Sequence, residues 1–224
     1  MSGSPVIAID GPSASGKGTI AAEVAAALGF HYLDSGSLYR LVALVALQNH
    51  VPLDAEAELE RVAAGLDIEF RAKDVILSGK TVTSDIRTEA CSIAASRVAA
   101  IPGVRRALLA RQRAFRRAPG LVADGRDMGT VVFPDAELKI FLTASAEARA
   151  ERRYKQLIEN GIDANISSIL QDIAERDARD QGRSTAPLQV AEDALVVDST
   201  HLGIAQVVAR VLEPWRERSA DPKR

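Results

Sequence analysis

The chain has 224 residues, a length that suits one domain or one domain carrying a smaller insert. Hydrophobic residues make up 47% of it and charged residues 26%, so a sizeable core beneath a polar surface is expected. The formal net charge of −2 argues against bulk affinity for a nucleic-acid polymer or an anionic membrane surface. Arginines cluster in the second half of the chain, which leaves a local basic cleft open.

Signals for export and for membrane insertion are weak in this sequence. The first five residues have no basic flank and no long apolar core, so we do not expect a secretory signal peptide. The longest apolar run, residues 41–47, is too short to span a bilayer. The single cysteine, Cys91, excludes an internal disulfide, fits a reducing compartment and is interpreted as a small buried hydrophobe. The histidines show no metal-ligand spacing, and we expect a cytoplasmic protein.

The chain opens with a glycine-rich loop between two regular elements. A short apolar strand is expected over residues 6–9, ending in Asp10, and an alanine-rich helix over residues 20–28. Strand, glycine loop and helix form the context that a phosphate-binding P-loop requires. The predicted ATP-binding loop consists of Gly11, Pro12, Ser13, Ala14, Ser15, Gly16, Lys17, Gly18 and Thr19.

The residue types in this loop suit a polyanion. Gly11 allows a sharp turn, and Gly16 lets backbone N–H groups approach phosphate oxygens. The following helix directs its positive N-terminal end at the same anion, and Lys17 reaches the outer phosphates as a point charge. Gly18 stands where Ser or Thr usually supplies a hydroxyl to magnesium, and Thr19 follows one residue later. The alternative is a loop that only turns the chain.

The next elements are a strand and two helices. They are expected as a strand over 30–34, a helix through 41–47 that is apolar on most faces, and a helix over 55–64. Ser35 or Ser37 is expected to cap the first helix, because a hydroxyl satisfies free N–H groups there. Pro52 ends that helix, and Gly65 is the expected C-cap of the second.

The hydrophobic period then changes. Residues 66–71 alternate apolar and polar side chains, as a half-buried strand does. Two more short strands are indicated by residues 75–77 and by Val82, with a turn at residues 78–80. Short strands joined by tight turns form an antiparallel sheet. Because this sheet interrupts an alternating α/β pattern, it is interpreted as an insert at about 66–83.

Alternation of strands and helices resumes after two helices, over 88–100 and 104–117, which Pro102 and Gly103 separate. The remaining elements are strands over 121–124, 138–142 and 195–198, and helices over 146–157, 166–181 and 204–218. This order predicts an α/β fold, a parallel sheet with helices on both faces. Ligands of such sheets bind at the carboxyl ends of the strands. The polar residues there are Asp10, Asp34 with Ser35, residues 124–127 and Asp198.

A P-loop accounts only for a nucleoside triphosphate, so the second substrate must be recognised elsewhere. Arg40 opens a buried helix just after a strand end, and Arg126 and Asp127 lie between two glycines at another strand end. Residues 175–183 alternate charges late in a helix. An Arg-Asp pair between glycines has little structural reason to exist, which makes Asp127 the strongest of these candidates.

On these motifs the chain resembles the bacterial cytidylate kinases, within the nucleoside monophosphate kinase family. The matching segments are residues 9–13 with 16–19, 33–36 with 39–40, 85–88, 94–96, 123–134 and 175–183. The Gly-Arg-Asp-Met-Gly-Thr block at 125–130 is the most specific part, since many kinases share a P-loop. A Gly-Thr ending of the P-loop, as at Gly18 and Thr19, is usual in this family.

The resemblance implies a five-stranded parallel sheet with a small antiparallel β insert that binds substrate and a short helical lid. We expect one P-loop kinase domain over residues 1–224, with a substrate-binding region at about 35–105 and the lid at about 150–183. It implies transfer of the γ-phosphoryl group of ATP to CMP, and to dCMP, giving CDP or dCDP and ADP. A monomer that binds neither a nucleic-acid polymer nor a membrane is expected.

The resemblance also assigns roles to individual residues. The base contacts are Ser96, Arg105 and Asp127, and the contacts to the acceptor phosphate are Ser35, Arg40, Arg126 and Arg183. The sugar contacts are Arg176 and Asp180, and Arg152 and Arg153 of the lid clamp the transferring group. The catalytic set is Lys17, Arg126, Arg153 and Arg183, and Mg²⁺ accompanies ATP with Thr19 or waters as its nearest partners.

These assignments agree with the chemistry of the substrates. Cytosine presents an amino donor and ring acceptors, which a carboxylate and an arginine complement. The acceptor phosphate needs planar bidentate donors, which arginine supplies. Since a phosphate has a second pKa of about 6, the acceptor is already largely dianionic and no general base is expected. Catalysis is expected to come from in-line positioning and from cations around the transferring group.

Several residues also have a plainer interpretation. Arg105 alone would be a solvated helix arginine, and Ser96 a serine bonded to its own turn. Arg126 would form a surface ion pair, for example with Asp124, and Arg152 and Arg153 would lie on a helix surface beside Glu151.

Two other functions stay open from the sequence. One is a kinase of the same fold for UMP, AMP or shikimate, which the base contacts at Ser96, Arg105 and Asp127 disfavour. The other is a non-catalytic nucleotide switch. The sequence has no Asn-Lys-x-Asp segment of the kind that reads guanine, and its arginines exceed what one triphosphate needs.

Overall fold

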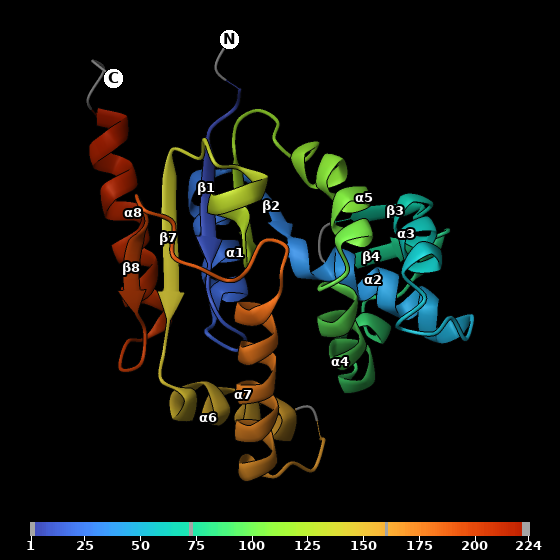
Figure 1. Cartoon of the computed structure of the whole chain (residues 1–224). Helices are drawn as coiled ribbons and strands as arrows, with labels where there is room; N and C mark the ends of the chain where they lie inside the picture. Colours follow the sequence, from blue (N-terminus) through green and yellow to red (C-terminus); the bar gives the residue numbers. More distant parts are fainter. Residues whose placement is uncertain (1–2, 72–73, 160, 221–224) are drawn as a thin grey trace. The chain divides into compact units, whose positions relative to one another are not determined.

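The computed structural model of the chain describes residues 3–71, 74–159 and 161–220. It divides into two compact units (Figure 1). The first combines Met1–Leu33 with Phe115–Arg224, and the second is Asp34–Ala114.

A five-stranded sheet forms the centre of the first unit, with strand order β2-β6-β1-β7-β8. The strands are β1 (Val6–Asp10), β2 (His31–Asp34), β6 (Leu121–Gly125), β7 (Leu138–Thr143) and β8 (Leu195–Asp198). Parallel pairings join β1 to β6, β1 to β7 and β7 to β8. Residues 6–9 of β1 are fully buried, as expected for a central strand covered on both faces. The predicted parallel sheet of five strands is confirmed.

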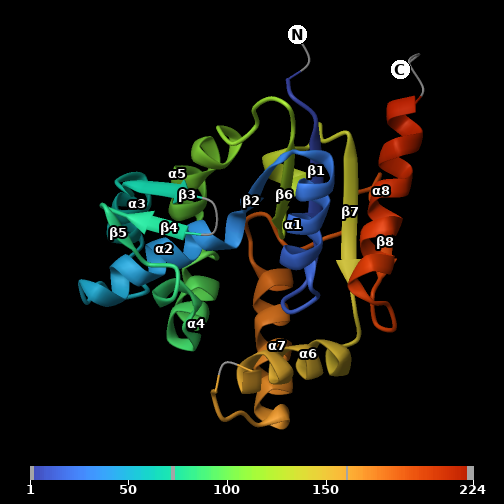
Figure 2. The same cartoon turned by 180° about the vertical axis from the view of Figure 1, so that it is seen from behind.

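Helices flank this sheet. The first unit contains α1 (Lys17–Leu28), the π-helical turn η2 (Met128–Val132), α6 (Ala146–Glu159), α7 (Ile166–Gly182) and α8 (Ile204–Ala220). Side chains of α1 and α8 share one apolar cluster with the central strands, and Figure 2 shows α1 lying along one face of the sheet. In Figure 1, β7 points toward the end of this unit that carries α6 and α7. Those helices therefore lie where ligands of parallel sheets bind.

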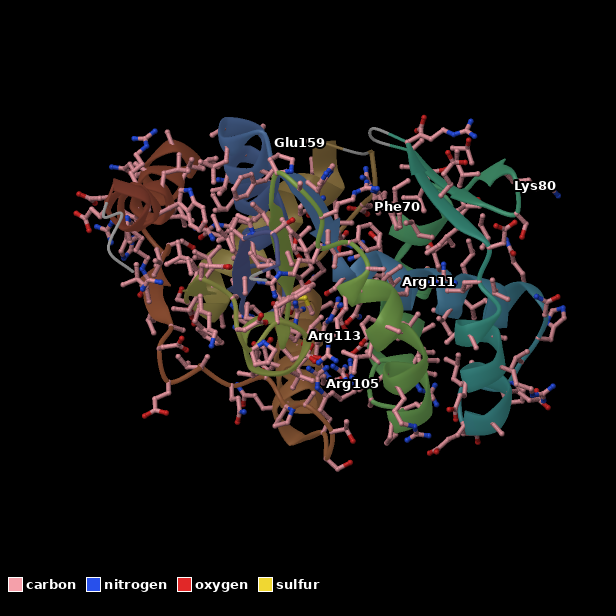
Figure 3. All side chains as sticks on the ribbon, turned by 90° about the horizontal axis from the view of Figure 1, so that it is seen from above. Phe70, Lys80, Arg105, Arg111, Arg113 and Glu159 are labelled. Carbon is pink, nitrogen blue, oxygen red and sulfur yellow. The ribbon has the colours of Figure 1, made fainter. Side chains whose placement is uncertain are left out.

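The second unit is built from helices and a small sheet. Its elements are α2 (Ser35–Gln48), α3 (Glu56–Ala64), β3 (Ile68–Arg71), β4 (Asp74–Leu77), β5 (Lys80–Thr81), η1 (Asp85–Arg87), α4 (Glu89–Val98) and α5 (Pro102–Arg113). Strands β3, β4 and β5 pair antiparallel, as predicted, although β5 ends before Val82. Ser78 and Gly79 both have positive φ, which makes the tight two-residue turn between β4 and β5. Lys80 follows that turn at the end of the hairpin (Figure 3).

Two local predictions were wrong, for reasons of capping. Asp34, and neither Ser35 nor Ser37, is the N-cap of α2: its carboxylate accepts hydrogen bonds from the backbone N–H and the hydroxyl of Ser37. The Asp34 carboxylate, at the end of β2, thus caps the helix in place of the predicted serine hydroxyl. Pro102 and Gly103 do not separate two helices but begin α5, because proline is tolerated at the first position of a helix.

A substitution at Gly11 tests how closely the glycine loop packs against the backbone of β7. A Cβ atom built on Gly11 would lie 2.1 Å from the carbonyl oxygen of Leu142, a backbone atom that has no side-chain freedom to move away. We expect Gly11→Ala to lower the free energy of unfolding by about 1–3 kcal/mol, as overpacking does, in a denaturant titration. Gly203→Ala is the control, since its Cβ would meet nothing closer than 3.7 Å. Equal stability of the two variants would contradict this account.

Candidate active site

The glycine loop between β1 and α1 has the backbone geometry of a P-loop. Gly16 has φ 89°, in the left-handed region, directly before the first residue of α1. Ala14 also has a positive φ, so the loop curls tightly before the helix begins. The Ser15 hydroxyl is buried and has no hydrogen-bond partner within the described ranges. A buried hydroxyl of this kind is satisfied when an acceptor, such as a phosphate oxygen, enters the loop.

Lys17 is buried at the base of this loop. Its ammonium group donates a hydrogen bond of 3.0 Å to the carbonyl oxygen of Pro12. Burial, together with the positive charges of Arg126 and Arg176, lowers the pKa of Lys17 to about 7, against the opposing effect of Asp124 and Asp180. Two arginines thus add positive charge near the buried Lys17, which favours an anionic ligand.

Asp124 faces the start of α1 from the neighbouring strand β6. Its carboxylate accepts a hydrogen bond of 2.6 Å from the Tyr32 hydroxyl. A Cβ atom on Gly18 would lie 3.4 Å from the same carboxylate oxygen. Thr19 is exposed, in the first turn of α1. The Thr19 hydroxyl and the Asp124 carboxylate therefore both lie near the N-terminal end of α1, and both are hard oxygen donors.

Arg126 and Asp180 form a close ion pair in the site. The Nε of Arg126 donates to a carboxylate oxygen of Asp180 over 2.7 Å, and both side chains are largely buried. Burial favours the neutral form of Asp180, but the charge and hydrogen bond of Arg126 hold the pKa of its carboxyl group below the usual value. The sequence suggested Asp124 as an ion-pair partner of Arg126, whereas the structure pairs Arg126 with Asp180 on α7.

Helix α7 brings several of the predicted residues together. Arg183, just past its last residue, has a guanidinium nitrogen 3.9 Å from the Asp180 carboxylate and another 4.0 Å from the Asp127 carboxylate. Arg176 lies one turn before Asp180 on the same helix. The first unit thus gathers Arg126 and Asp127 from the end of β6 with charged residues of α7.

Four predicted residues belong to the second unit: Ser35, Arg40, Ser96 and Arg105. Ser35 is buried in the first turn of α2, and Ser96 is buried in α4. Arg40 lies in α2, where its backbone carbonyl accepts a hydrogen bond from the Cys91 thiol. Burial raises the pKa of that thiol, in agreement with its interpretation as a buried apolar group.

Arg105 is not the solvated helix arginine considered from the sequence. It is buried, its guanidinium lies 5.5 Å from the centre of the Tyr39 ring, and it donates to the carbonyl oxygen of Ala99. Its neighbour Arg106 is exposed and pairs with Glu60. Figure 3 shows that Arg105 comes from α5, as do Arg111 and Arg113. Stacking on an aromatic ring fixes the plane of Arg105, which suits a directional contact.

The arginines of α6 differ from one another. Arg152 donates to the backbone carbonyls of Ser15 and Ser199 and to the Ser199 hydroxyl, so it braces the P-loop. Arg153 is hydrogen-bonded to Gln156 on the surface of its own helix. The interpretation as a helix-surface arginine therefore does not describe Arg152, whose partners are Ser15 and Ser199.

Sequence reasoning missed a buried ion pair beneath the P-loop. Arg149 donates to the carbonyl oxygen of Ser13 and lies 2.7 Å from the Asp177 carboxylate. Asp177 also accepts a hydrogen bond from the Ser13 hydroxyl over 3.4 Å. The alternating charges of residues 175–183 included Asp177, but nothing in a linear sequence pairs it with Arg149. Asp10, whose role was left open, accepts hydrogen bonds from Met128 and Gly129.

Comparison with known proteins identifies the family. The family model described as cytidylate kinase matches residues 7–217. The chain belongs to the cytidylate kinase family. Relatives named cytidylate kinase include proteins of Chromobacterium violaceum, 60% identical over 96% of this chain and 97% of the relative, and of Aeromonas salmonicida, 58% identical over 97% and 96%. A third, from Bordetella bronchiseptica, is 60% identical over 95% of each chain.

A solved structure shares the fold of the whole chain. It is an uncharacterised protein from Eubacterium ventriosum, with a TM-score of 0.52, 11% identity, and coverage of 96% of this chain and 99% of that one. At this identity the likeness concerns the fold alone. Members of the cytidylate kinase family carry out nucleotide-dependent phosphoryl transfer, which the P-loop geometry supports.

No helix in the part of the chain that the structure describes is long and apolar enough to cross a membrane. Within residues 3–71, 74–159 and 161–220, no group of three or more His, Cys, Asp or Glu side chains could hold a metal ion.

The lowered pKa of Lys17 predicts proton uptake when ATP binds. At pH 8, above a pKa of about 7, most Lys17 side chains are neutral, and a bound triphosphate raises that pKa because it stabilises the ammonium form. We expect uptake of about one proton per ATP, measured by calorimetry in buffers of different ionisation enthalpy. Lys17→Arg, which stays charged, is expected to take up none. Equal uptake by both proteins would contradict the assignment.

Loss of the buried ion pair between Arg149 and Asp177 is expected to lower the stability of the protein strongly. Removing one partner of a buried ion pair leaves the other charge uncompensated, which typically costs about 3–5 kcal/mol. We expect Arg149→Ala to lose about this much of the free energy of unfolding in a denaturant titration. Lys155→Ala, an exposed position on the same helix, is the control and should lose less than about 0.5 kcal/mol.

Proposed function

We propose that this protein transfers the γ-phosphoryl group of ATP to CMP, and to dCMP, giving CDP or dCDP and ADP. The observation that carries the proposal is the register of the two central strands, in which Asp10 of β1 pairs with Gly125 of β6. The P-loop follows the first strand, and Arg126 and Asp127 follow the second. The loop for a phosphate donor and a loop suited to a nucleotide acceptor therefore begin side by side.

The P-loop supplies the donor side of the reaction. Backbone N–H groups of residues 11–19 and the N-terminal end of α1 hold the phosphates of ATP. Lys17 contacts the outer phosphates, and its charged form is stabilised once they bind. These groups hold the γ-phosphoryl group for in-line attack, and we assign the remaining catalytic contacts to Arg126, Arg183 and Arg153.

The acceptor is recognised by charge and by hydrogen bonding. We assign the acceptor phosphate to Ser35, Arg40, Arg126 and Arg183, the sugar to Arg176 and Asp180, and the base to Ser96, Arg105 and Asp127. The burial and fixed plane of Arg105 support a base contact. The paired Arg126 and Asp180 support a site that is formed before substrate arrives. A dianionic acceptor phosphate attacks without the help of a general base.

A magnesium ion fits the residues at the start of α1. Thr19 and Asp124 are hard oxygen donors, and Asp124 lies close to Gly18, the residue before Thr19. We propose that these two side chains hold it, directly or through waters. When bound, Mg²⁺ neutralises charge on the ATP phosphates.

We further propose that the second unit's small sheet, at about 66–83, belongs to a substrate-binding region of about 35–105. The helices over about 150–183 act as a lid that excludes water from the transferring group. The single domain of 1–224, a monomeric state and a cytoplasmic location stay predictions, and size-exclusion chromatography with light scattering tests the monomer.

Substrate choice tests the proposed function. A coupled assay of ADP release with CMP, dCMP, UMP and AMP is expected to give the highest kcat/KM with the cytidine substrates. Equal rates with AMP and CMP would overturn the cytosine assignment. ATP hydrolysis without transfer to any monophosphate would favour a nucleotide switch.

Two variants distinguish the residues that act on the phosphoryl donor, ATP, from those that recognise the acceptor, CMP. Lys17→Met should lower kcat strongly while leaving the unfolding transition intact. Asp127→Ala should raise the KM for CMP by roughly 10- to 100-fold, the worth of a lost charge-assisted hydrogen bond, with little change in the KM for ATP. Asp135→Ala, which removes an exposed carboxylate paired with Arg116, is the control. An equal loss for CMP and ATP in Asp127→Ala would count against base reading.

A further inference from the structure

Asp10 caps the turn that carries the base-reading loop. It is the last residue of β1 and is buried. Its two carboxylate oxygens accept hydrogen bonds of 2.8 Å each, one from the backbone N–H of Met128 and one from that of Gly129. These are the first two N–H groups of η2, which no carbonyl of the turn itself can satisfy. A carboxylate from a distant strand thus caps this turn.

Capping by Asp10 bears on Asp127, which occupies the N-cap position of the same turn. Aspartate at an N-cap ordinarily accepts a hydrogen bond from the second or third N–H of its own helix. The second N–H here belongs to Gly129 and is taken by Asp10. The Asp127 side chain makes no capping hydrogen bond to its own turn. Its backbone carbonyl still closes the turn, accepting from Val131 and Val132.

We propose that Asp10 is a positioning residue for recognition of the acceptor base. By capping the turn in place of Asp127, it keeps the Asp127 carboxylate from folding back onto its own backbone and directs it toward the base. This inference rests on the proposed function, in which Asp127 reads cytosine. Because Gly11 follows Asp10 directly, the residue that positions the acceptor loop also begins the phosphate-binding loop.

The environment of Asp10 makes this positioning sensitive to pH. Burial raises the pKa of Asp10 to about 6, although the hydrogen bonds from Gly129 and Met128 oppose the rise. The charge of Asp127 contributes to this rise and that of Arg126 opposes it, while the stem of Lys139 on β7 lies beside Gly129. As pH falls through about 6, Asp10 gains a proton, and one of its oxygens can no longer accept from the turn. Base recognition should then weaken.

Asp10→Asn tests the proposal. The amide keeps the size of the carboxylate but turns an NH₂ group against one backbone N–H. We expect the ratio of kcat/KM for CMP to that for UMP to fall roughly 10- to 100-fold, as for a lost charge-assisted hydrogen bond, and the KM for ATP to change less than about 3-fold. Asp135→Asn is the matched control. A retained CMP preference, or an equal loss with CMP, UMP and ATP, would show that Asp10 acts only on the fold.

The unmodified protein offers a second test that does not depend on folding of the variant. The CMP to UMP ratio is measured between pH 5.5 and 7.5; both substrates carry the same phosphate, so its titration cancels. We expect the ratio to fall below about pH 6, and this dependence to disappear in Asp10→Asn where that variant folds. A flat ratio in the unmodified protein overturns the inference alone. Absence of any CMP preference overturns the proposed function as well.

Discussion

Buried charge at the carboxyl ends of the central strands is the constraint on which the rest of this structure depends. An isolated ionised group away from water is costly unless an opposite charge and hydrogen bonds compensate it. Arg126 and Arg149 are both largely buried, and each finds its carboxylate, Asp180 and Asp177, on α7. One helix therefore compensates the loop that follows β6 and braces the P-loop that follows β1. Without α7 both loops would carry unpaired charge.

Two polar groups of the P-loop, the Lys17 ammonium group and the Ser15 hydroxyl, are buried in an environment that suits a bound anion. Burial lowers the pKa of Lys17, and the positive charges of Arg126 and Arg176 contribute to the same shift. The Ser15 hydroxyl is buried with no hydrogen-bond partner in the described part of the chain. A triphosphate relieves both conditions at once, since it supplies negative charge to the lysine and an acceptor to the hydroxyl. Much of the affinity for ATP is thus prepared in the folded protein.

The register of β1 and β6 connects the two substrates. Asp10 and Gly125 are paired in the sheet, so the phosphate-binding loop and the Arg126–Asp127 loop leave it at the same level. The hydrogen bonds from Met128 and Gly129 to Asp10 then tie the second loop to the strand that begins the first. In-line transfer depends on the relative placement of donor and acceptor. A strand pairing fixes such a placement more firmly than mobile loops would.

The sequence by itself determined the order and type of the elements, the P-loop and the residues that carry charge to the strand ends, because hydrophobic period and motif spacing are local properties of the chain. It erred where tertiary partners decide: Asp34 caps α2, and Arg105 is buried against Tyr39. Only the tertiary structure paired Arg126 with Asp180, 54 residues away, and turned Asp10 toward the turn after Asp127. An ion pair or a cap needs distance and direction, and residues far apart in sequence acquire these only when the strands and α7 assemble.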